Sequence, residues 1–358
     1  MDLEVLREEI RKRDLEIIRL IAERTAIAED VAKTKIETHK PLRNPEVEKK
    51  VIARYVNEGT SKGLSEETMK TVASALIAEA VESESRLMKK NVGKHVAIIG
   101  GAGKMGAWMS DLMTENGSSV VIIDPAVNNG KTIEDCSDCD VVIVSVPIHL
   151  TESILKGLDD ICRKDALIFE LTSLKTPIVG TLKDLASKRK VCSIHPMFGP
   201  SAKSMFNRNL IVCDCGNKTA VDETVSMFGD LGGNIRVMDI SEHDGYMSYV
   251  LGLTHAVNIA LFTVLDNSGY SFGDLKTVAS TTFNKGLDTN VSVASEDPML
   301  YYEIQHMNSH RDEMWDLFTK AVNDLREASL SDNPERFVSI MDSGRKYFAK
   351  IDKEIYKD

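Results

Sequence analysis

The chain has 358 residues, of which 42% are hydrophobic and 28% charged, and its formal net charge is −11. This length suffices for two or three domains with buried cores. The negative charge argues against nucleic acid or an anionic membrane surface as the main partner. The N-terminal stretch MDLEVLREEIRKRD is charged from its second residue, and no later run is expected to span a membrane, so we predict a cytoplasmic protein.

The cysteine and histidine spacing predicts no metal site. Cys136 and Cys139 form one C-x-x-C pair, but no second pair completes a zinc site, so reduced structural thiols are expected. His306 and His310 are four residues apart on an expected helix, without a third ligand.

The first ninety residues predict three helices. Between Leu3 and about Thr38 there is no Gly or Pro, and apolar residues recur at helical spacing. A helix of roughly 35 residues is about 50 Å long, which is too long for so small a domain, so we expect it to pack along a partner subunit. Further helices are predicted from about Pro45 to Glu58 and from about Glu66 to Lys89.

From His95 the periodicity changes to short apolar runs separated by 10–15-residue segments. The runs are HVAIIG, SVVIID, DVVIVSVP, ALIFELTS, KVCSIH and NLIVCD. This alternation predicts a parallel sheet covered on both faces. From about Glu242 the pattern is helical again, so the predicted domains are residues 1–92, 93–240 and 241–358.

Gly101-x-Gly103-x-x-Gly106 follows the first of these runs and opens a helix with Lys104 and Met105. Such glycines let a backbone turn tightly against a pyrophosphate, which rests on the helix N-terminus. Asp124 ends the next run, where it would bind ribose hydroxyls and repel a 2′-phosphate, so NAD is expected rather than NADP. A plain turn residue is the alternative reading of Asp124.

Polar residues follow three of the later strands, where ligands bind in an open α/β sheet. They are Ser145 to Pro147, Thr172 to Lys175, and His195 to Pro200. We expect all three sets to border the nicotinamide, with Ser145 and Pro147 also contacting the cofactor.

VIVSVPIHLTES, HPMFGP and ISEHDGYMSYVLGLTHAV closely resemble prephenate dehydrogenase, and LREEIRKRDLEIIRLIAERTAIAEDVAKTK resembles the all-helical class of chorismate mutase. Their order resembles the bifunctional enzymes of tyrosine biosynthesis. The resemblance implies a multidomain fold: an all-α three-helix mutase domain, an α/β Rossmann-like parallel-sheet domain and an all-α C-terminal dimerisation domain. It further implies a homodimer that uses NAD, chorismate and prephenate, with tyrosine as an inhibitor.

The resemblance implies that His195 binds the C4 hydroxyl of prephenate and takes its proton. It places Ser145 and Lys175 beside the nicotinamide and substrate, His255 facing the active site, and His243 near the site where tyrosine inhibits. From the residues alone, Lys175 can be a solvated loop cation, His255 a core histidine, and His243 part of a helix cap.

Two arginines of the enteric relatives correspond to Asn284 and Ser292 in this sequence. Because a prephenate dianion needs cations, either Lys285 substitutes or the substrate is held differently.

In the mutase half, Arg24 and Lys35 are eleven residues apart, which places them within about 20° of each other on a helix. Both are expected to point inward, and Glu84 lies on the buried stripe of the third helix. The resemblance implies that Arg7 reaches the mutase site of the partner subunit and that Asn44 and Glu48 lie near the chorismate hydroxyl. A family arginine is Val47 here, and a family serine is Ala80.

Three alternatives remain open on the sequence. The helical module can be a non-catalytic dimerisation or regulatory element, as Val47 and Ala80 suggest. The dehydrogenase can act on arogenate, which carries an amino group in place of the keto oxygen. A non-catalytic NAD-sensing protein would leave His195 without a chemical role.

Overall fold

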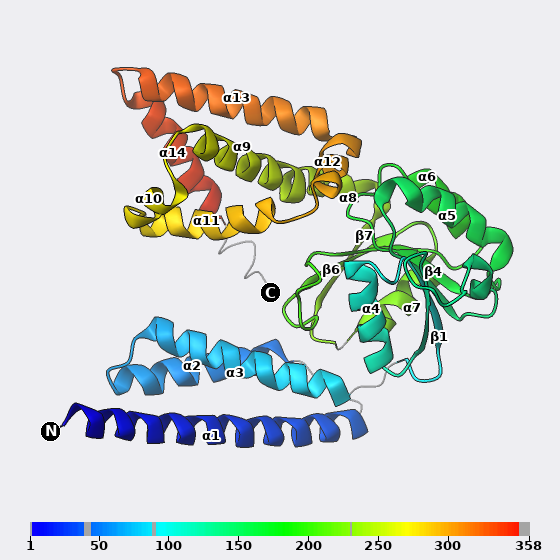
Figure 1. Ribbon diagram of the computed structural model, residues 1–358, viewed down its shortest axis with the longest axis horizontal. Helices are drawn as coiled ribbons and strands as arrows, with labels where there is room; N and C mark the ends of the chain where they lie inside the picture. Colours follow the sequence, from blue (N-terminus) through cyan, green and yellow to red (C-terminus); the bar gives the residue numbers. More distant parts are fainter. Residues whose placement is uncertain (1, 39–43, 88–90, 230, 351–358) are drawn as a thin grey trace. The chain divides into compact units, whose positions relative to one another are not determined.

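A computed structural model describes residues 2–38, 44–87, 91–229 and 231–350 of the chain (Figure 1). It forms two compact units, Met1–Ile240 and Ser241–Asp358, and each is described by itself. The first unit contains the helical N-terminal segment and the sheets, and the second is helical.

The N-terminal segment consists of three helices, α1 (Leu3–Glu37), α2 (Pro45–Ser61) and α3 (Glu66–Leu87), which confirms the prediction. α1 and α2 both pack against α3. Asp2 caps α1 by accepting a hydrogen bond of 3.2 Å from the backbone N–H of Glu4. Ala32 is the one fully buried residue of α1, and most of its large apolar side chains are exposed. Within the first unit, the described residues therefore leave the apolar face of α1 uncovered.

A four-stranded parallel sheet follows, with strand order β2-β1-β3-β4. The strands are β1 (His95–Ile99), β2 (Ser119–Ile123), β3 (Val141–Val144) and β4 (Leu167–Glu170). Helices α4 (Lys104–Glu115), α5 (Ile148–Ile161) and α6 (Val179–Ala186) alternate with them in the chain, as Figure 1 shows. Every residue of β3 and β4 is buried, as their unbroken apolar runs predict for strands covered on both faces.

Three more strands form a second sheet in the order β5-β6-β7. They are β5 (Ser193–Pro196), β6 (Asn209–Asp214) and β7 (Asn234–Asp239), and α7 (Lys218–Phe228) connects the last two. β5 and β6 are antiparallel, which corrects the expectation of a wholly parallel sheet. An isolated bridge between Ile168 and Val191 joins the two sheets in parallel orientation, so β5 continues a segment that runs beside β4.

The second unit begins within one long helical stretch, α8 (Ile240–Met247), a π-helical segment (Ser248–Leu253) and α9 (Thr254–Asn267). Five helices complete it: α10 (Phe272–Thr277), α11 (Thr281–Ala294), α12 (Pro298–Met307), α13 (Arg311–Leu330) and α14 (Glu335–Phe348). By length and composition alone, the helical stretch Ile240–Asn267 can cross a membrane, because an 18-residue window within it has a mean hydropathy of 1.6. This corrects the expectation that no run approaches that length.

Candidate active sites

The glycine loop after β1 is shaped as the cofactor expectation requires. A Cβ on Gly106 would clash with the carbonyl oxygen of Gly100 and lie 2.8 Å from the Cα of Gly101, so only glycine lets α4 approach this loop. Gly103 is the N-cap of α4 and has no side chain to cap it. The helix therefore begins at Lys104 and Met105 without a side-chain hydrogen bond to its first N–H groups. The N–H groups of this turn suit a pyrophosphate, and the cradle fits a dinucleotide.

Asp124, directly after β2, forms hydrogen bonds to the backbone of the glycine loop and of its own turn. One carboxylate oxygen accepts from the backbone N–H of Ala102 at 3.0 Å, and the other accepts from Ala126 at 2.9 Å. A carboxylate can accept about four hydrogen bonds, so Asp124 keeps capacity for ribose hydroxyls. The turn-residue reading and the ribose reading are therefore compatible.

The carboxyl ends of β3 and β4 lie at the same edge of the parallel sheet, because the two strands pair directly. Ser145 follows β3 and is half-buried, and Pro147 is the exposed N-cap of α5. Ser145 donates its backbone N–H to Ile99 at 2.8 Å, which places it beside the glycine loop. Both residues therefore follow β3 on the side of the sheet where the glycine loop lies, and their contact with the cofactor stays a prediction.

Lys175 lies in a different environment from the one expected. Its side chain is fully buried, and its ammonium donates to the Glu170 carboxylate at 2.8 Å, the Thr172 carbonyl at 2.7 Å and the Ile194 carbonyl at 2.9 Å. An ammonium has three N–H donors, and these bonds engage all three. This excludes the solvated loop cation, and it turns Lys175 toward protein groups. Sequence reasoning missed Glu170, whose only signal was an acid inside a buried apolar run.

His195 lies within β5 rather than in the loop after it, opposite Ile211 of β6, and is 4% exposed. The loop that follows is anchored by Trp108 of α4. The Trp108 indole N–H donates to the Ala202 carbonyl at 2.6 Å, and its ring packs edge-on against Phe198 at 4.9 Å between centroids. Sequence reasoning also missed Trp108, which lies on the helix that the glycine loop opens.

In the second unit, His243 is fully buried and its Nδ1 lies 2.7 Å from a carboxylate oxygen of Asp244. His255 is 7% exposed and stacks on Tyr301, with ring centroids 3.9 Å apart. Burial lowers the pKa of His255 to about 4, and its Nδ1 has no hydrogen-bond partner among the described residues. A neutral histidine with a free ring nitrogen suits both a core role and a site role.

The α11 residues at the family's arginine positions are polar but uncharged. Asn284 is half-buried and its amide oxygen has no partner among the described residues, Ser292 is exposed, and Lys285 is an exposed cation. His243, His255 and Lys285 belong to the second unit, so their approach to His195 stays a prediction.

In the helical segment, Arg24 and Lys35 both point inward, as their spacing predicts. Arg24 donates to the Leu76 carbonyl at 2.7 Å, and the Lys35 ammonium lies 3.5 Å from the Glu84 carboxylate. Burial raises the pKa of Glu84, the positive charges of Lys35 and Arg24 oppose that rise, and Glu48 adds to it. Two cations and a buried carboxyl therefore meet between α1 and α3.

The other predicted mutase residues lie outside the cluster of Arg24, Lys35 and Glu84. Arg7 is exposed and pairs with Glu4 at 2.6 Å, and Asn44 caps α2 by accepting from Glu46 and Val47. Val47 is exposed and Ala80 is buried. Sequence reasoning missed the hydrogen bond that Ser83 donates to Glu29, which joins α3 to α1 close to Glu84 in the sequence.

Three family descriptions match successive parts of this chain. Residues 6–85 match "Chorismate mutase type II", residues 105–237 match "Prephenate dehydrogenase, nucleotide-binding domain", and residues 239–343 match "Prephenate dehydrogenase, dimerization domain". The matches follow the predicted order of domains.

Individual relatives agree with these matches. The T-protein of Enterobacter agglomerans is 26% identical over 85% of this chain and 81% of its own length. A probable arogenate/prephenate dehydrogenase of Methanocaldococcus jannaschii is 26% identical over 72% of this chain, which spans 62% of that relative's length. The prephenate dehydrogenase of A. aeolicus, solved with hydroxyphenyl propionate and NAD+, shares the fold with a TM-score of 0.58 and 23% identity, over 72% of this chain and 98% of that one. The chain joins a type II chorismate mutase domain to both domains of a prephenate dehydrogenase, and it belongs to the bifunctional chorismate mutase/prephenate dehydrogenase family.

Proposed function

We propose that this chain rearranges chorismate to prephenate in its helical segment, and oxidises and decarboxylates prephenate to 4-hydroxyphenylpyruvate with NAD+, as two steps of tyrosine biosynthesis. The observation that carries the proposal is the combination of two sites in one chain. One consists of the glycine cradle after β1 and His195 on β5, and the other is the inward cluster of Arg24, Lys35 and Glu84.

For the dehydrogenase, Gly101, Gly103, Gly106 and Asp124 would hold the cofactor, with Lys104, Met105, Ser145 and Pro147 lining its path. NAD+, when bound, accepts the hydride that leaves C4 of prephenate. His195, as a neutral imidazole, takes the proton of the C4 hydroxyl as that oxygen gains carbonyl character. When the ring carboxylate leaves as CO2, its electron pair returns to the ring, and the resulting phenolate oxygen takes the proton back from His195. The new double bonds make the ring aromatic, which drives the step.

Lys175 contributes by holding the backbone beside His195, through its bond to the Ile194 carbonyl. His255 and Lys285 are proposed to meet the substrate, with Lys285 replacing the missing arginines. His243 is proposed to lie where tyrosine inhibits.

For the mutase, the rearrangement is intramolecular, so the protein needs no nucleophile. Arg24 and Lys35 would bind the carboxylates of chorismate, and Glu84, when protonated, would donate a hydrogen bond to the breaking ether oxygen. Glu48 and Asn44 are proposed to meet the hydroxyl region, and Arg7 to reach the site of a second subunit.

We further propose a cytoplasmic homodimer. The match to a dimerization domain and the uncovered apolar face of α1 both support a second copy of the chain as partner. The apolar stretch Ile240–Asn267 falls wholly within the dimerization match, so an interface accounts for its composition.

Arogenate is the second candidate substrate for the dehydrogenase half. The archaeal relative is named a probable arogenate/prephenate dehydrogenase, and α11 lacks the arginines of the enteric relatives. Competition between the two substrates for NADH formation separates them.

The first experiment supplies purified protein with chorismate and NAD+ and follows both chorismate loss and NADH. We expect both signals to change. Arg24→Ala should abolish chorismate loss and keep NADH formation from added prephenate. His195→Asn should keep chorismate loss and abolish NADH formation from either substrate. Arg19→Ala, an exposed cation on the same helix, is the matched control. If prephenate alone yields NADH in the unmodified protein, the helical segment is a non-catalytic module. If His195→Asn keeps full turnover, His195 is not the base.

A further inference from the structure

Three residues that the proposed reactions do not use meet at the amino-terminal edge of the parallel sheet. His95 opens β1, and Asp138 and Cys139 lie in the turn before β3. β1 and β3 pair in parallel, and Asp140 donates its backbone N–H to the His95 carbonyl at 2.8 Å, so the two strand starts are adjacent. The glycine loop follows the other end of β1. The cluster is therefore separate from the cofactor site.

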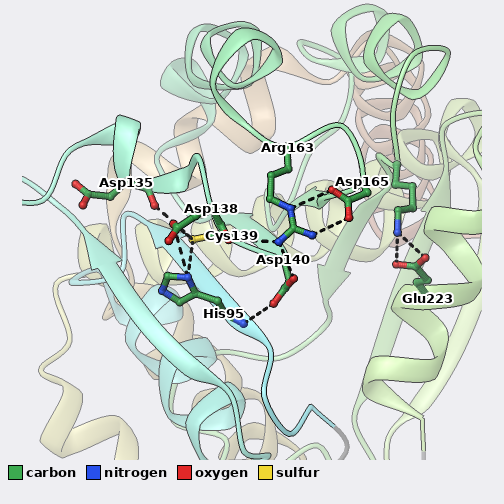
Figure 2. Close-up of polar contacts among 9 residues, drawn as sticks. His95, Asp135, Asp138, Cys139, Asp140, Arg163, Asp165 and Glu223 are labelled. Atoms are coloured by element: carbon green, nitrogen blue, oxygen red, sulfur yellow. Dashed lines mark hydrogen bonds and ion pairs between the residues drawn. The ribbon is translucent and has the colours of Figure 1, made fainter.

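The three side chains point their ligand atoms at one another, as Figure 2 shows. The His95 Nδ1 lies 3.7 Å from the Asp138 Oδ1 and 3.8 Å from the Cys139 Sγ, and the Sγ lies 4.0 Å from the same carboxylate oxygen. Around tetrahedral zinc, with bonds of about 2.0–2.3 Å, such atoms lie about 3.3–3.6 Å apart. A contraction of a few tenths of an ångström makes the triangle fit the ion.

A network outside the cluster fixes the position of His95. The Asp140 carboxylate accepts the His95 backbone N–H at 2.8 Å and a hydrogen bond from Arg163 at 3.1 Å. Arg163 in turn binds Asp165 through two bonds of 3.0 and 2.7 Å (Figure 2). Such outer contacts commonly orient the ligands of a metal site. Asp138 is exposed, so its side chain is free to close onto an ion.

The donor set selects the kind of ion. One imidazole nitrogen, one thiol sulfur and one carboxylate oxygen suit zinc, whereas magnesium and calcium prefer oxygen alone. The Cys139 thiol contacts the Asp135 carbonyl at 3.4 Å, and binding an ion as thiolate would release that proton.

From this geometry we propose that His95, Asp138 and Cys139 bind one zinc ion, with water in the fourth position. The site revises the expectation of no metal, which rested on the missing second C-x-x-C pair. Only Cys139 of the C-x-x-C pair takes part, because Cys136 hydrogen-bonds Cys162 instead. A ligand 44 residues away along the chain, as His95 is from Cys139, gives no spacing signal.

The test titrates the full-length, chelator-treated protein with cobalt(II) and then zinc(II). We expect one cobalt per chain with a thiolate-to-cobalt charge-transfer absorption, displacement by zinc, and a higher Tm with zinc. His95→Gln, Asp138→Asn and Cys139→Ser should each weaken zinc binding at least about tenfold. His306→Gln and Cys215→Ser, an exposed histidine and a buried cysteine elsewhere, should bind as the unmodified protein does.

Absence of the charge-transfer absorption, or equal zinc affinity in His95→Gln and the unmodified protein, overturns the proposal. If Cys139→Ser fails to fold, His95→Gln still decides, because the His95 side chain is partly exposed at a strand end. NAD+ affinity should be the same with and without zinc, which separates this site from the proposed dehydrogenase site.

Discussion

The Lys175 ammonium donates a 2.9 Å hydrogen bond to the carbonyl oxygen of Ile194, the residue that precedes His195. The same ammonium pairs with Glu170 at the end of β4, and both side chains are fully buried. One buried ion pair therefore ties the strand that ends at Glu170 to the strand that carries the proposed base.

Removing the cation from this pair should weaken both the fold and the reaction. Lys175→Met leaves Glu170 buried without its partner, so we expect a loss of about 3–5 kcal/mol in the free energy of unfolding. Urea unfolding measures it. The kcat for prephenate should fall more than KM changes, because His195 loses its support. The double variant Glu170→Gln/Lys175→Met should recover much of the stability, while Lys218→Met, in an exposed pair with Asp222, should leave stability and kcat unchanged.

Glu84 should give the mutase reaction a distinctive pH dependence. Burial raises the pKa of this carboxyl, so it takes up a proton at a higher pH than an exposed glutamate does. Only the protonated form can donate to the ether oxygen, so chorismate turnover should rise as pH falls through that pKa. Glu84→Gln should remove the dependence, and Glu79→Gln, exposed on the same helix, should keep it. A flat profile in the unmodified protein between about pH 5 and 8 would contradict the role of Glu84.

His255 should make the fold sensitive to acid. Its pKa is lowered to about 4 by burial, against 6.5 for an unperturbed histidine. Between these two pH values the histidine is protonated in the unfolded chain and neutral in the folded chain. The contribution of His255 to the free energy of unfolding is therefore fully present above about pH 6.5 and is lost as pH falls toward 4. The urea midpoint should drop over this range in the unmodified protein. It should drop less in His255→Asn, and His306→Gln should behave as the unmodified protein does.

Two glycines should respond in opposite ways to the same added methyl group. Gly106→Ala places a Cβ against the Gly100 carbonyl, so the loop must shift and NAD+ affinity should be lost. At Gly180 in α6, no described atom lies within 4 Å of an added Cβ. Gly180→Ala should therefore stabilise the protein by about 0.4–1 kcal/mol and leave NAD+ binding intact. Isothermal titration with NAD+ compares the two, and unchanged affinity in Gly106→Ala would refute the cradle.

The periodicity of the sequence was sufficient to predict the three N-terminal helices, the helical character of the second unit and the strands that are buried on both faces. It did not separate the individual helices of the second unit. It was not sufficient for β7, whose residues Asn234 and Arg236 interrupt the apolar run because the strand is largely exposed. The antiparallel direction of β5 and β6 depends on how the chain returns, and apolar runs carry no direction.

The candidate site shows the same limit. Gly106 and Asp124 were predictable because their chemistry depends on neighbours in the chain. The burial of Lys175 was not, because it depends on Ile194 and Glu170, which arrive from two other strands.

The π-helical turn of Ser248–Leu253 changes the spacing of two histidines. Twelve residues at about 100° each would place His243 and His255 about 120° apart around a regular helix. A π turn absorbs one extra residue, so the effective separation is eleven residues, or about 20°. Both rings can then lie on one side of the stretch, and both are buried. Within this turn, the Gly252 carbonyl also accepts a hydrogen bond from the Gln305 side-chain amide at 2.6 Å. A single wide turn thus shifts the angular spacing of the residues on either side of it, so a helical wheel drawn for a regular α-helix places these two histidines about 100° further apart than the π turn allows.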